Sequence, residues 1–565
     1  MKRVIFGKVH ENFNFKTHIP FGPWCFIGCE NKYKWQQYRF PEDAFKTKHD
    51  FQQAAQNVDS IINYLFPVLC DYLNKVNGVR YSDKFWQIMA MPWLSLFVQN
   101  IITSYYRLKG FLDGYSTDFI FECSPKNNPI FENTLDFIQN GIRNIDYNEG
   151  VYYHIICNCF PNLNVDKRLQ RENISRFQIP IRNSYKFKLK FFLKDLLAIK
   201  SVYGISVRDS VLLSLFVKRV KNHNRKKTSF KEKISSTFLA EMEWESFAIS
   251  CLPKCFLNIN NFSVNPFAPT YHFKIVSGSL LYTEEEQKYK LASYVEKGGT
   301  IVTSQHGSNY GVLSTFLWIK HVEYRHSHYI SWGWKDHQGL KTGATPLPSP
   351  LIEQFRNHQV EQEKKSDILL IGTTTSPFYT FIGTFHQPNQ VLEYRDDKLF
   401  FLTSLSQNCF NRIKYRYYPV DETQLLDKEY VQARFPKIKL CDGNLNAQMG
   451  QASLIVSDHP GTTFNLTMGA NVPTIGFWNP EHWGFTEEAE ELFFKLKQQK
   501  IIFDTPKEAA DHINQIANNI PKWWNSTKVQ KARSAWSDKY ARASKNWKKD
   551  WKRAIKKLNE EIVSH

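Results

Sequence analysis

The residue of this sequence best suited to acid–base chemistry is His306, in the segment 304–307 (SQHG). An imidazole titrates near neutral pH and can take a proton from a reacting hydroxyl group. Gly307 beside it leaves space for a substrate to approach the backbone. The segment therefore predicts a catalytic base, and the alternative is that His306 is only a structural residue of a turn.

A second polar segment, residues 457–463 (SDHPGTT), directly precedes a predicted helix at 463–470. The N-terminus of a helix offers free backbone N–H groups and a partial positive charge, which favour phosphate binding. We expect the hydroxyl groups to complete a phosphate site, and the acid and imidazole to hydrogen-bond to ribose or phosphate. The alternative is that Thr462 or Thr463 simply caps the helix. The predicted nucleotide-binding residues of this segment are Asp458, His459, Gly461, Thr462 and Thr463.

A third polar loop, residues 372–376 (GTTTS), adds Thr374 to the predicted phosphate-binding residues. The sequence contains neither GxxxxGK[ST] nor GxGxxG, the patterns of two common phosphate-binding loops. It also lacks HExxH and any pair of aspartates in the pattern DxD. We therefore expect a phosphate site built from helix ends and hydroxyl groups, with no metal ligands and no cofactor.

Two predicted strands and a helix must position the first of these loops. Residues 273–277 (FKIVS) and 300–305 (TIVTSQ) are the predicted strands, and residues 283–296 between them form a predicted helix with Thr283 as its N-cap. This alternation is typical of a parallel α/β sheet, which binds ligands at the carboxyl ends of its strands. His306 directly follows the second strand, so we expect it at the ligand-binding edge.

A second α/β unit is predicted after a proline-rich and polar segment, residues 345–366. Its predicted strands are residues 367–371, 452–457 and 472–478, and a polar loop follows each of the first two. We place the domain boundary at about residues 350–366, because the composition changes there.

The part of the chain before residue 250 is aromatic-rich and carries helical patterns. Helices are predicted at residues 51–76, 85–108 and 188–220. The strongly basic segment 218–233 is either a solvated surface or a contact for an anionic partner.

The C-terminal 45 residues predict one long amphipathic helix. Residues 522–557 contain thirteen Lys and Arg against two Asp. The apolar residues recur in steps of three and four, as one face of a helix requires. This face either packs on the protein body or lies on a membrane surface, which the basic face would suit. The apolar positions are Trp536, Tyr540, Ala543, Trp547, Trp551, Ala554 and Leu558.

Composition narrows the class of protein. The chain has 565 residues, 15% aromatic content and a formal net charge of +19, which favours polyanionic partners. Its ten cysteines form no CxxC pair, so we expect neither a disulfide scaffold nor a structural zinc site. The N-terminus is charged too early for a signal peptide, and no apolar stretch reaches the roughly 18–20 residues that span a bilayer. We expect a cytoplasmic protein that associates peripherally with the inner membrane.

The sequence resembles a family of transferases encoded in O-antigen and other surface-polysaccharide gene clusters. The likeness extends over nearly the whole chain, and its motifs are specific in their order rather than one by one. More distantly, the QHG and HP elements are similar to those of the Kdo transferases of capsule and lipopolysaccharide synthesis. The HG and SD elements are also similar to those of CDP-polyol phosphotransferases. The motifs are residues 22–25 (GPWC), 80–81 (RY), 85–88 (FWQI), 92–94 (PWL), 305–307 (QHG), 310–311 (YG), 331–334 (SWGW), 457–463 (SDHPGTT), 473–475 (PTI) and 477–478 (FW).

The resemblance implies a GT-B architecture, in which two Rossmann-like domains face a cleft. The N-terminal domain, residues 1–355, would bind the acceptor and carry helical insertions. Residues 366–520 would bind the nucleotide sugar, and residues 521–565 would form the basic helix. The two loops would come from different domains and meet only when the cleft closes. His306, Gln305 and Glu323 would be the catalytic residues, although a structural salt bridge is an alternative for Glu323.

The implied function is a metal-independent glycosyltransferase of O-antigen or capsule polysaccharide synthesis. Its donor would be a nucleotide sugar, with a CMP-linked ulosonic acid as the leading choice. Its acceptor would be a lipid-linked glycan at an anionic membrane surface, and no nucleic acid is expected as a partner. The alternatives are a CDP-polyol phosphotransferase, a basic nucleic-acid-binding protein and a non-catalytic scaffold.

Overall fold

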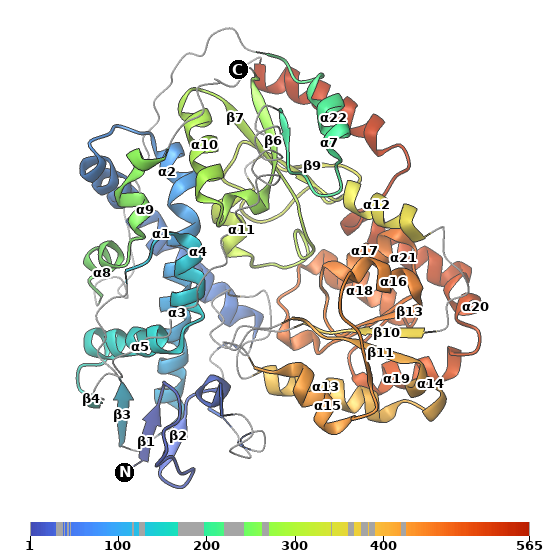
Figure 1. Cartoon of the computed structure of the whole chain (residues 1–565), viewed down its shortest axis with the longest axis horizontal. Helices are drawn as coiled ribbons and strands as arrows, with labels where there is room; N and C mark the ends of the chain where they lie inside the picture. Colours follow the sequence, from blue (N-terminus) through green and yellow to red (C-terminus); the bar gives the residue numbers. More distant parts are fainter. Residues whose placement is uncertain are drawn as a thin grey trace.

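The computed structural model describes most of the chain and shows three parallel β-sheets covered by helices (Figure 1). Thr374 and residues 220–233 of the basic segment lie outside the described residues. The described residues are 2–29, 35, 38, 40–41, 45, 47–115, 118–123, 130–167, 197–219, 242–262, 271–340, 342–359, 367–373, 382, 390–419 and 425–563.

The N-terminal sheet is small, and long helices cover it. Its strands pair in the order β2-β1-β3-β4, all parallel. The helix α1 (Lys48–Asn77) begins at a reciprocal capping box between Thr47 and Asp50 and ends at Gly78, which adopts the left-handed conformation with φ 63°. The strands are β1 (Lys2–Ile5), β2 (His18–Pro20), β3 (Phe119–Cys123) and β4 (Asn164–Lys167). The other helices of this part are α4 (Thr134–Asp136), α5 (Ile145–Cys159), α8 (Trp244–Ser250) and α9 (Lys254–Leu257).

The single helix predicted at 85–108 is wrong. The structure has two helices, α2 (Asp83–Met89) and α3 (Met91–Gly114), which are bent by 63° at their junction. Pro92 lacks a backbone N–H, so it fits the first turn of a new helix better than the middle of an old one. No single helix of the described chain is long and apolar enough to span a membrane; the bent pair meets that length and composition test only jointly.

The middle sheet positions the first predicted loop. Its five strands are parallel and pair in chain order. The predicted strands at 273–277 and 300–305 are confirmed, whereas the helix between them has Glu284 rather than Thr283 as its N-cap. The strands are β5 (Ile199–Lys200), β6 (Phe273–Ser277), β7 (Thr300–Ser304), β8 (His328–Ser331) and β9 (Ala344–Pro346). The helices are α10 (Glu285–Glu296) and α11 (Leu317–Val322).

The helix predicted at 188–220 is wrong over its described part, residues 197–219. The chain there forms β5, which pairs with β6, and then α7 (Val207–Ser214). Between them, Ser201 and Gly204 have φ values of 55° and 79°, which a continuous helix cannot contain.

The C-terminal sheet has six parallel strands in the order β12-β11-β10-β13-β14-β15. Numbered from its first strand, this order is 3-2-1-4-5-6, that of a doubly wound dinucleotide-binding fold. The strands are β10 (Asp367–Ile371), β11 (Ile413–Arg416), β12 (Lys439–Leu440), β13 (Ala452–Ser457), β14 (Thr474–Phe477) and β15 (Ile502–Phe503). The helices are α13 (Gln390–Ser404), α14 (Gln407–Arg412), α15 (Asp427–Arg434), α16 (Leu445–Gln451), α17 (Thr462–Ala470), α18 (Glu487–Gln498), α19 (Pro506–Ile516) and α20 (Ile520–Trp524).

The C-terminal basic segment is two helices rather than the single one predicted. The helix α21 (Thr527–Tyr540) packs against α17 and α18, and α22 (Trp547–Val563) crosses back to the middle sheet (Figure 1). The helix breaks because the backbone of Arg542 bonds elsewhere: its N–H to the Trp332 carbonyl oxygen at 2.9 Å and its own carbonyl oxygen to the Ser349 N–H at 2.8 Å.

The predicted packing of the C-terminal tryptophan face is confirmed. Trp547 and Trp551 are buried in the cluster that covers the middle sheet. The helix α12 (Pro350–Gln359) follows the last strand of the middle sheet and packs on α17 of the C-terminal unit. The predicted α/β class, with two parallel-sheet units that carry polar loops, is therefore confirmed, and the β1–β4 sheet is an addition to it.

Candidate functional site

Gln305 shapes the loop that follows β7. Its side-chain oxygen accepts hydrogen bonds from the Trp332 N–H at 2.8 Å and the Trp334 Nε1–H at 2.9 Å, and its Nε2 donates to the Gly307 carbonyl oxygen at 2.8 Å. The side chain is buried. We therefore interpret Gln305 as a positioning residue rather than the catalytic residue expected from the sequence.

The loop presents His306 with its Nδ1 atom already engaged. Nδ1 lies 2.8 Å from the Tyr310 hydroxyl, which donates to Oε1 of Glu323 at 2.8 Å. Because the tyrosine hydrogen points to the carboxylate, Nδ1–H is the donor to the tyrosine oxygen and Nε2 keeps its lone pair. The two ends of this relay, Nδ1 and Oε1, are 3.6 Å apart. The arrangement is that of a base held in one tautomer.

Glu323 is completely buried behind the histidine. Hydroxyl groups of Tyr282 and Tyr329, at 2.5 and 3.4 Å, also donate to its carboxylate. Gly278 lies so close that a Cβ atom there would be 2.0 Å from the carboxylate. Burial raises the pKa of Glu323 to about 7, against the lowering effect of the hydroxyl groups. In the described part of the chain Glu323 forms no salt bridge with lysine or arginine; the basic side chain beside it is that of His306.

The imidazole of His306 is a neutral base at physiological pH. Burial lowers its pKa to about 4. Its side chain is still 24% exposed, so a substrate can reach it. The ring of Tyr203, from the loop between β5 and α7, stacks on it at a centroid distance of 6.0 Å.

The second loop, after β13, also holds a histidine against a carboxylate. Oδ1 of Asp458 lies 2.8 Å from Nδ1 of His459, and Oδ2 accepts from the Tyr394 hydroxyl at 2.7 Å. Nζ of Lys398 lies 3.4 Å from the same Oδ2. Asp458 is buried, and its contacts orient His459; the ribose or phosphate contact expected from the sequence stays a prediction.

The loop leads into α17 without a side-chain cap. The N-cap residue is Gly461, so the alternative that Thr462 or Thr463 merely caps the helix is wrong. A Cβ atom on Gly461 would lie 2.4 Å from Nε2 of His459, so glycine makes room for the imidazole at the helix N-terminus. The free N–H groups of the first turn, the imidazole and the hydroxyl groups together suit an anion.

The two loops are in contact. The Ser308 N–H donates to Oγ1 of Thr462 at 3.1 Å, and a Cβ atom on Gly307 would lie 3.2 Å from the same oxygen. The expectation that the loops meet only on closure is therefore wrong, because glycine at position 307 allows the helix N-terminus to approach this closely. The structure brings together His306, Glu323, His459, Gly461, Thr462 and Thr463 around two neighbouring loops.

Residues 2–555 match the model of the LIC12162 family transferase. The chain belongs to the LIC12162 family of transferases. This confirms the expected membership of a transferase family. A search of curated proteins finds no sequence that matches.

Three solved structures are similar to parts of this LIC12162 family member. The wall teichoic acid polymerase TagF is 11% identical over 53% of this chain and 84% of its own, with a TM-score of 0.32. The trehalose 6-phosphate synthase of Burkholderia multivorans is 10% identical over 52% and 70%, with a TM-score of 0.31. The lipopolysaccharide glycosyltransferase WaaG is 9% identical over 50% and 75%, with a TM-score of 0.25.

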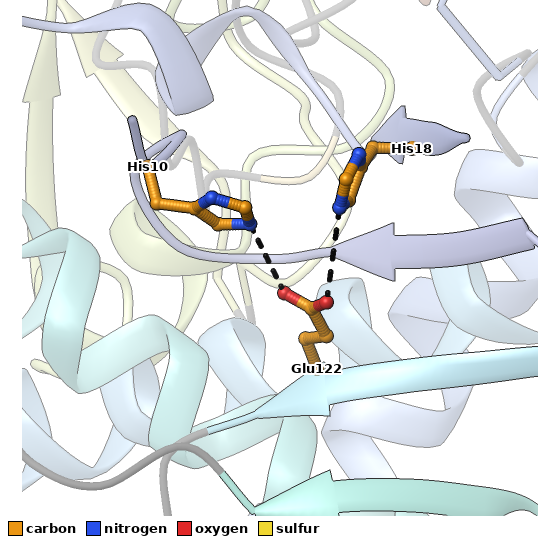
Figure 2. A group of neighbouring side chains, drawn as sticks. All are labelled: His10, His18 and Glu122. Carbon is orange, nitrogen blue, oxygen red and sulfur yellow. Dashed lines mark ion pairs between the residues drawn. The ribbon is translucent and has the colours of Figure 1, made fainter. Parts of the chain in front are cut away.

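Three residues of the types that bind metal ions lie together elsewhere in this family member, at the N-terminal sheet. Figure 2 shows His10 and His18 directed at the carboxylate of Glu122, with nitrogen–oxygen distances of 3.7 and 4.0 Å. The guanidinium of Arg3 holds the same carboxylate at 2.7 Å and also bonds to Asp166. Because a cation already neutralises Glu122, we interpret the group as an ion-pair cluster. Figure 1 places this sheet at the opposite end of the N-terminal half from β7.

Sequence reasoning missed the tyrosines of the site. Tyr310 is four residues after His306, and the spacing of the QHG and YG motifs does not by itself predict that their side chains meet. Tyr282 and Tyr203 come from other elements, and their spacing carries no signal. Only the order of strands in the sheet brings them to one edge.

Proposed function

We propose that this transferase is a glycosyltransferase that moves a sugar from a nucleotide-activated donor to a glycan hydroxyl group. The observation that carries the proposal is the hydrogen bond from the Ser308 N–H to Thr462, because it joins the loop of the proposed base to the helix end of the proposed anion site. A transfer from a sugar phosphate needs both, one for each end of the reaction.

The base activates the acceptor. In this proposal Nε2 of His306 takes the proton of the acceptor hydroxyl as its oxygen attacks the anomeric carbon of the donor. The positive charge that develops on the imidazole is stabilised through Tyr310 by the carboxylate of Glu323. The bond from the anomeric carbon to the donor phosphate breaks, and its electron pair goes to the phosphate oxygen.

The helix end receives the leaving group. The N–H groups at the start of α17 and the hydroxyl of Thr463 bind the phosphate that gains negative charge. In this proposal the donor-bound His459 carries a hydrogen on both ring nitrogens, so that Nε2–H donates to the phosphate while Nδ1–H donates to Asp458, which fixes the ring orientation. This chemistry uses side chains and backbone N–H groups of the chain itself.

The donor class and cellular role follow from the sequence resemblance. We propose a CMP-linked ulosonic acid as the donor and a lipid-linked glycan of O-antigen or capsule synthesis as the acceptor. The protein would work at the cytoplasmic face of the inner membrane as a peripheral protein. The net charge of +19 supports a location near anionic lipid.

Thermal shift with a panel of donors tests the proposal. CMP-, CDP-, UDP-, GDP- and dTDP-sugars, together with CDP-glycerol, are each added with and without Mg²⁺. Stabilisation by one sugar nucleotide, followed by its turnover, supports glycosyl transfer and names the donor. Stabilisation and turnover by CDP-glycerol alone would replace it with polyol-phosphate transfer. Absence of any shift would contradict a nucleotide donor.

A further inference from the structure

Exposed apolar side chains are concentrated on one short segment. Eleven large hydrophobic side chains of the described chain are exposed, and five of them lie between residues 203 and 215. Four of the five belong to α7 and the turn after it, on its outward face. The five are Tyr203 (45% exposed), Val207 (39%), Val211 (42%), Leu212 (48%) and Leu215 (67%).

The opposite face of α7 is already packed. Ser210, Leu213 and Ser214 are buried, and Leu213 joins Val217 in the cluster over the middle sheet. A surface helix normally turns its polar residues outward. Here the outward face is apolar, so a partner that covers apolar surface fits it.

Positive charge surrounds the apolar face. Arg208 on α7 and Lys218 and Arg219 just after it are exposed. Next to α7 lies α22, joined by an ion pair between Lys548 and Asp209 at 2.7 Å and by Lys552 over the ring of Phe216 (Figure 1). The six cationic side chains of α22 are all exposed, namely Lys548, Lys549, Lys552, Arg553, Lys556 and Lys557.

We propose that α7 and α22 form a membrane-docking surface for an anionic bilayer. The side chains of Val211, Leu212 and Leu215 enter the boundary between headgroups and acyl chains, and the lysines of α22 contact the headgroups. A second copy of the chain fits less well, since the cationic side chains around the apolar faces of the two copies would repel each other. A nucleic acid would contact the cations and leave the apolar face in water.

The docking surface runs directly into the candidate site. Tyr203, four residues before Val207, stacks on His306. The loop between them is fixed, because Gly204 lies against the backbone of Pro350 and Leu351, where a Cβ atom would be 2.2 Å from the Leu351 nitrogen. A glycan on a lipid carrier could thus reach the base without leaving the surface. This last step rests on the proposed function, whereas docking itself does not.

Co-sedimentation with vesicles tests the proposal. The full chain is mixed with vesicles of phosphatidylcholine alone or with added phosphatidylglycerol, and bound protein is measured. The double variant Leu212→Ser/Leu215→Ser should bind anionic vesicles about tenfold more weakly, as expected for two partly inserted apolar side chains. The pair Lys549→Glu/Lys556→Glu should lose binding to anionic vesicles and keep any weak binding to neutral ones.

A matched control separates docking from general hydrophobicity. Phe400→Ser/Phe494→Ser removes two exposed apolar side chains of the C-terminal unit and should bind as wild type does. Equal binding of wild type and the Leu212/Leu215 variant would overturn the proposal, and so would a wild-type dimer that this variant converts to a monomer. The donor-induced thermal shift is measured in parallel, so a failure of the proposed function shows independently of vesicle binding.

Discussion

The loops after β7 and β13 contain the same types of residue, a histidine and a buried carboxyl group, but suit different chemistry. In each, a histidine at the carboxyl end of a central strand directs Nδ1 toward a buried carboxyl group. At His306 a tyrosine stands between the two, and the carboxyl has no cationic neighbour among the described residues. At His459 the carboxyl touches the imidazole directly and Lys398 lies behind it.

This difference decides what each histidine can do. The carboxyl of Glu323, surrounded by hydroxyl groups, has a pKa raised by burial to about 7, so its charge can change near neutral pH. Beneath the second loop, Lys398 contacts both Asp458 and Asp427. Burial would raise the pKa of Asp427, but Lys398 and Arg395 lower it overall, so Asp427 stays ionised. The first loop is suited to moving a proton, and the second to holding a fixed charge near an anion.

The largest effect should come from His306→Ala. Loss of a general base should reduce turnover by about two to four orders of magnitude. Steady-state kinetics with the donor found by the panel measures it, and the exposed His358→Ala is the matched control. Full activity of His306→Ala would show that the first histidine is only structural.

The second largest effect should come from His459→Ala, on binding rather than turnover. A hydrogen bond to a charged phosphate contributes about 1.5–3 kcal/mol, so donor affinity should fall by roughly ten- to a hundredfold. Isothermal titration with the donor measures it. If affinity is unchanged while turnover falls, the two loops share the catalytic work and the comparison fails.

Glu323→Gln should change the pH dependence of kcat/KM. In wild type, kcat/KM should rise with pH through about 7, because ionised Glu323 compensates the imidazolium that forms. The variant should lose that rise and be about tenfold slower above it. An unchanged pH profile would remove Glu323 from the relay.

The same variant should change the pH dependence of stability. For Glu323 the folded pKa of about 7 exceeds the ordinary value of 4.5, so its contribution falls as pH rises between these values. For His306 the folded pKa of about 4 lies below 6.5, so its contribution rises with pH over that window. The two offset each other in wild type. Denaturant unfolding of Glu323→Gln should therefore show stability that increases more steeply with pH than in wild type, and parallel curves would contradict this.

Thr463→Val should give the smallest effect. The variant removes one hydroxyl at the start of α17 and should weaken nucleotide binding by about fivefold, as for one ordinary hydrogen bond. Its melting temperature should change little, because Gly461 is the N-cap. Unchanged affinity with a lower melting temperature would mean that the hydroxyl only stabilises the helix.

The loops could be predicted from the sequence because both signals are local. A buried strand followed by a polar loop identifies β7 and β13, and each histidine is the second residue after its strand. The hydrogen-bonded group around Glu323 could not be predicted from the sequence, since Tyr282 and Glu323 come from different elements and meet only through the order of strands. The helix break at Arg542 cannot be predicted either, because tertiary hydrogen bonds of its backbone outweigh a periodic pattern. The break at Ala90 has a local cause instead, because Pro92 begins a new helix.

The most direct test is donor binding by purified His306→Ala. We assign proton transfer to the first loop and phosphate binding to the second, although Ser308 and Thr462 are in contact. Isothermal titration should give a donor affinity within about twofold of wild type for a folded protein that no longer turns over. A loss of donor affinity that matches the loss of turnover would show that His306 is a donor ligand, and the assigned division between the two loops would be wrong.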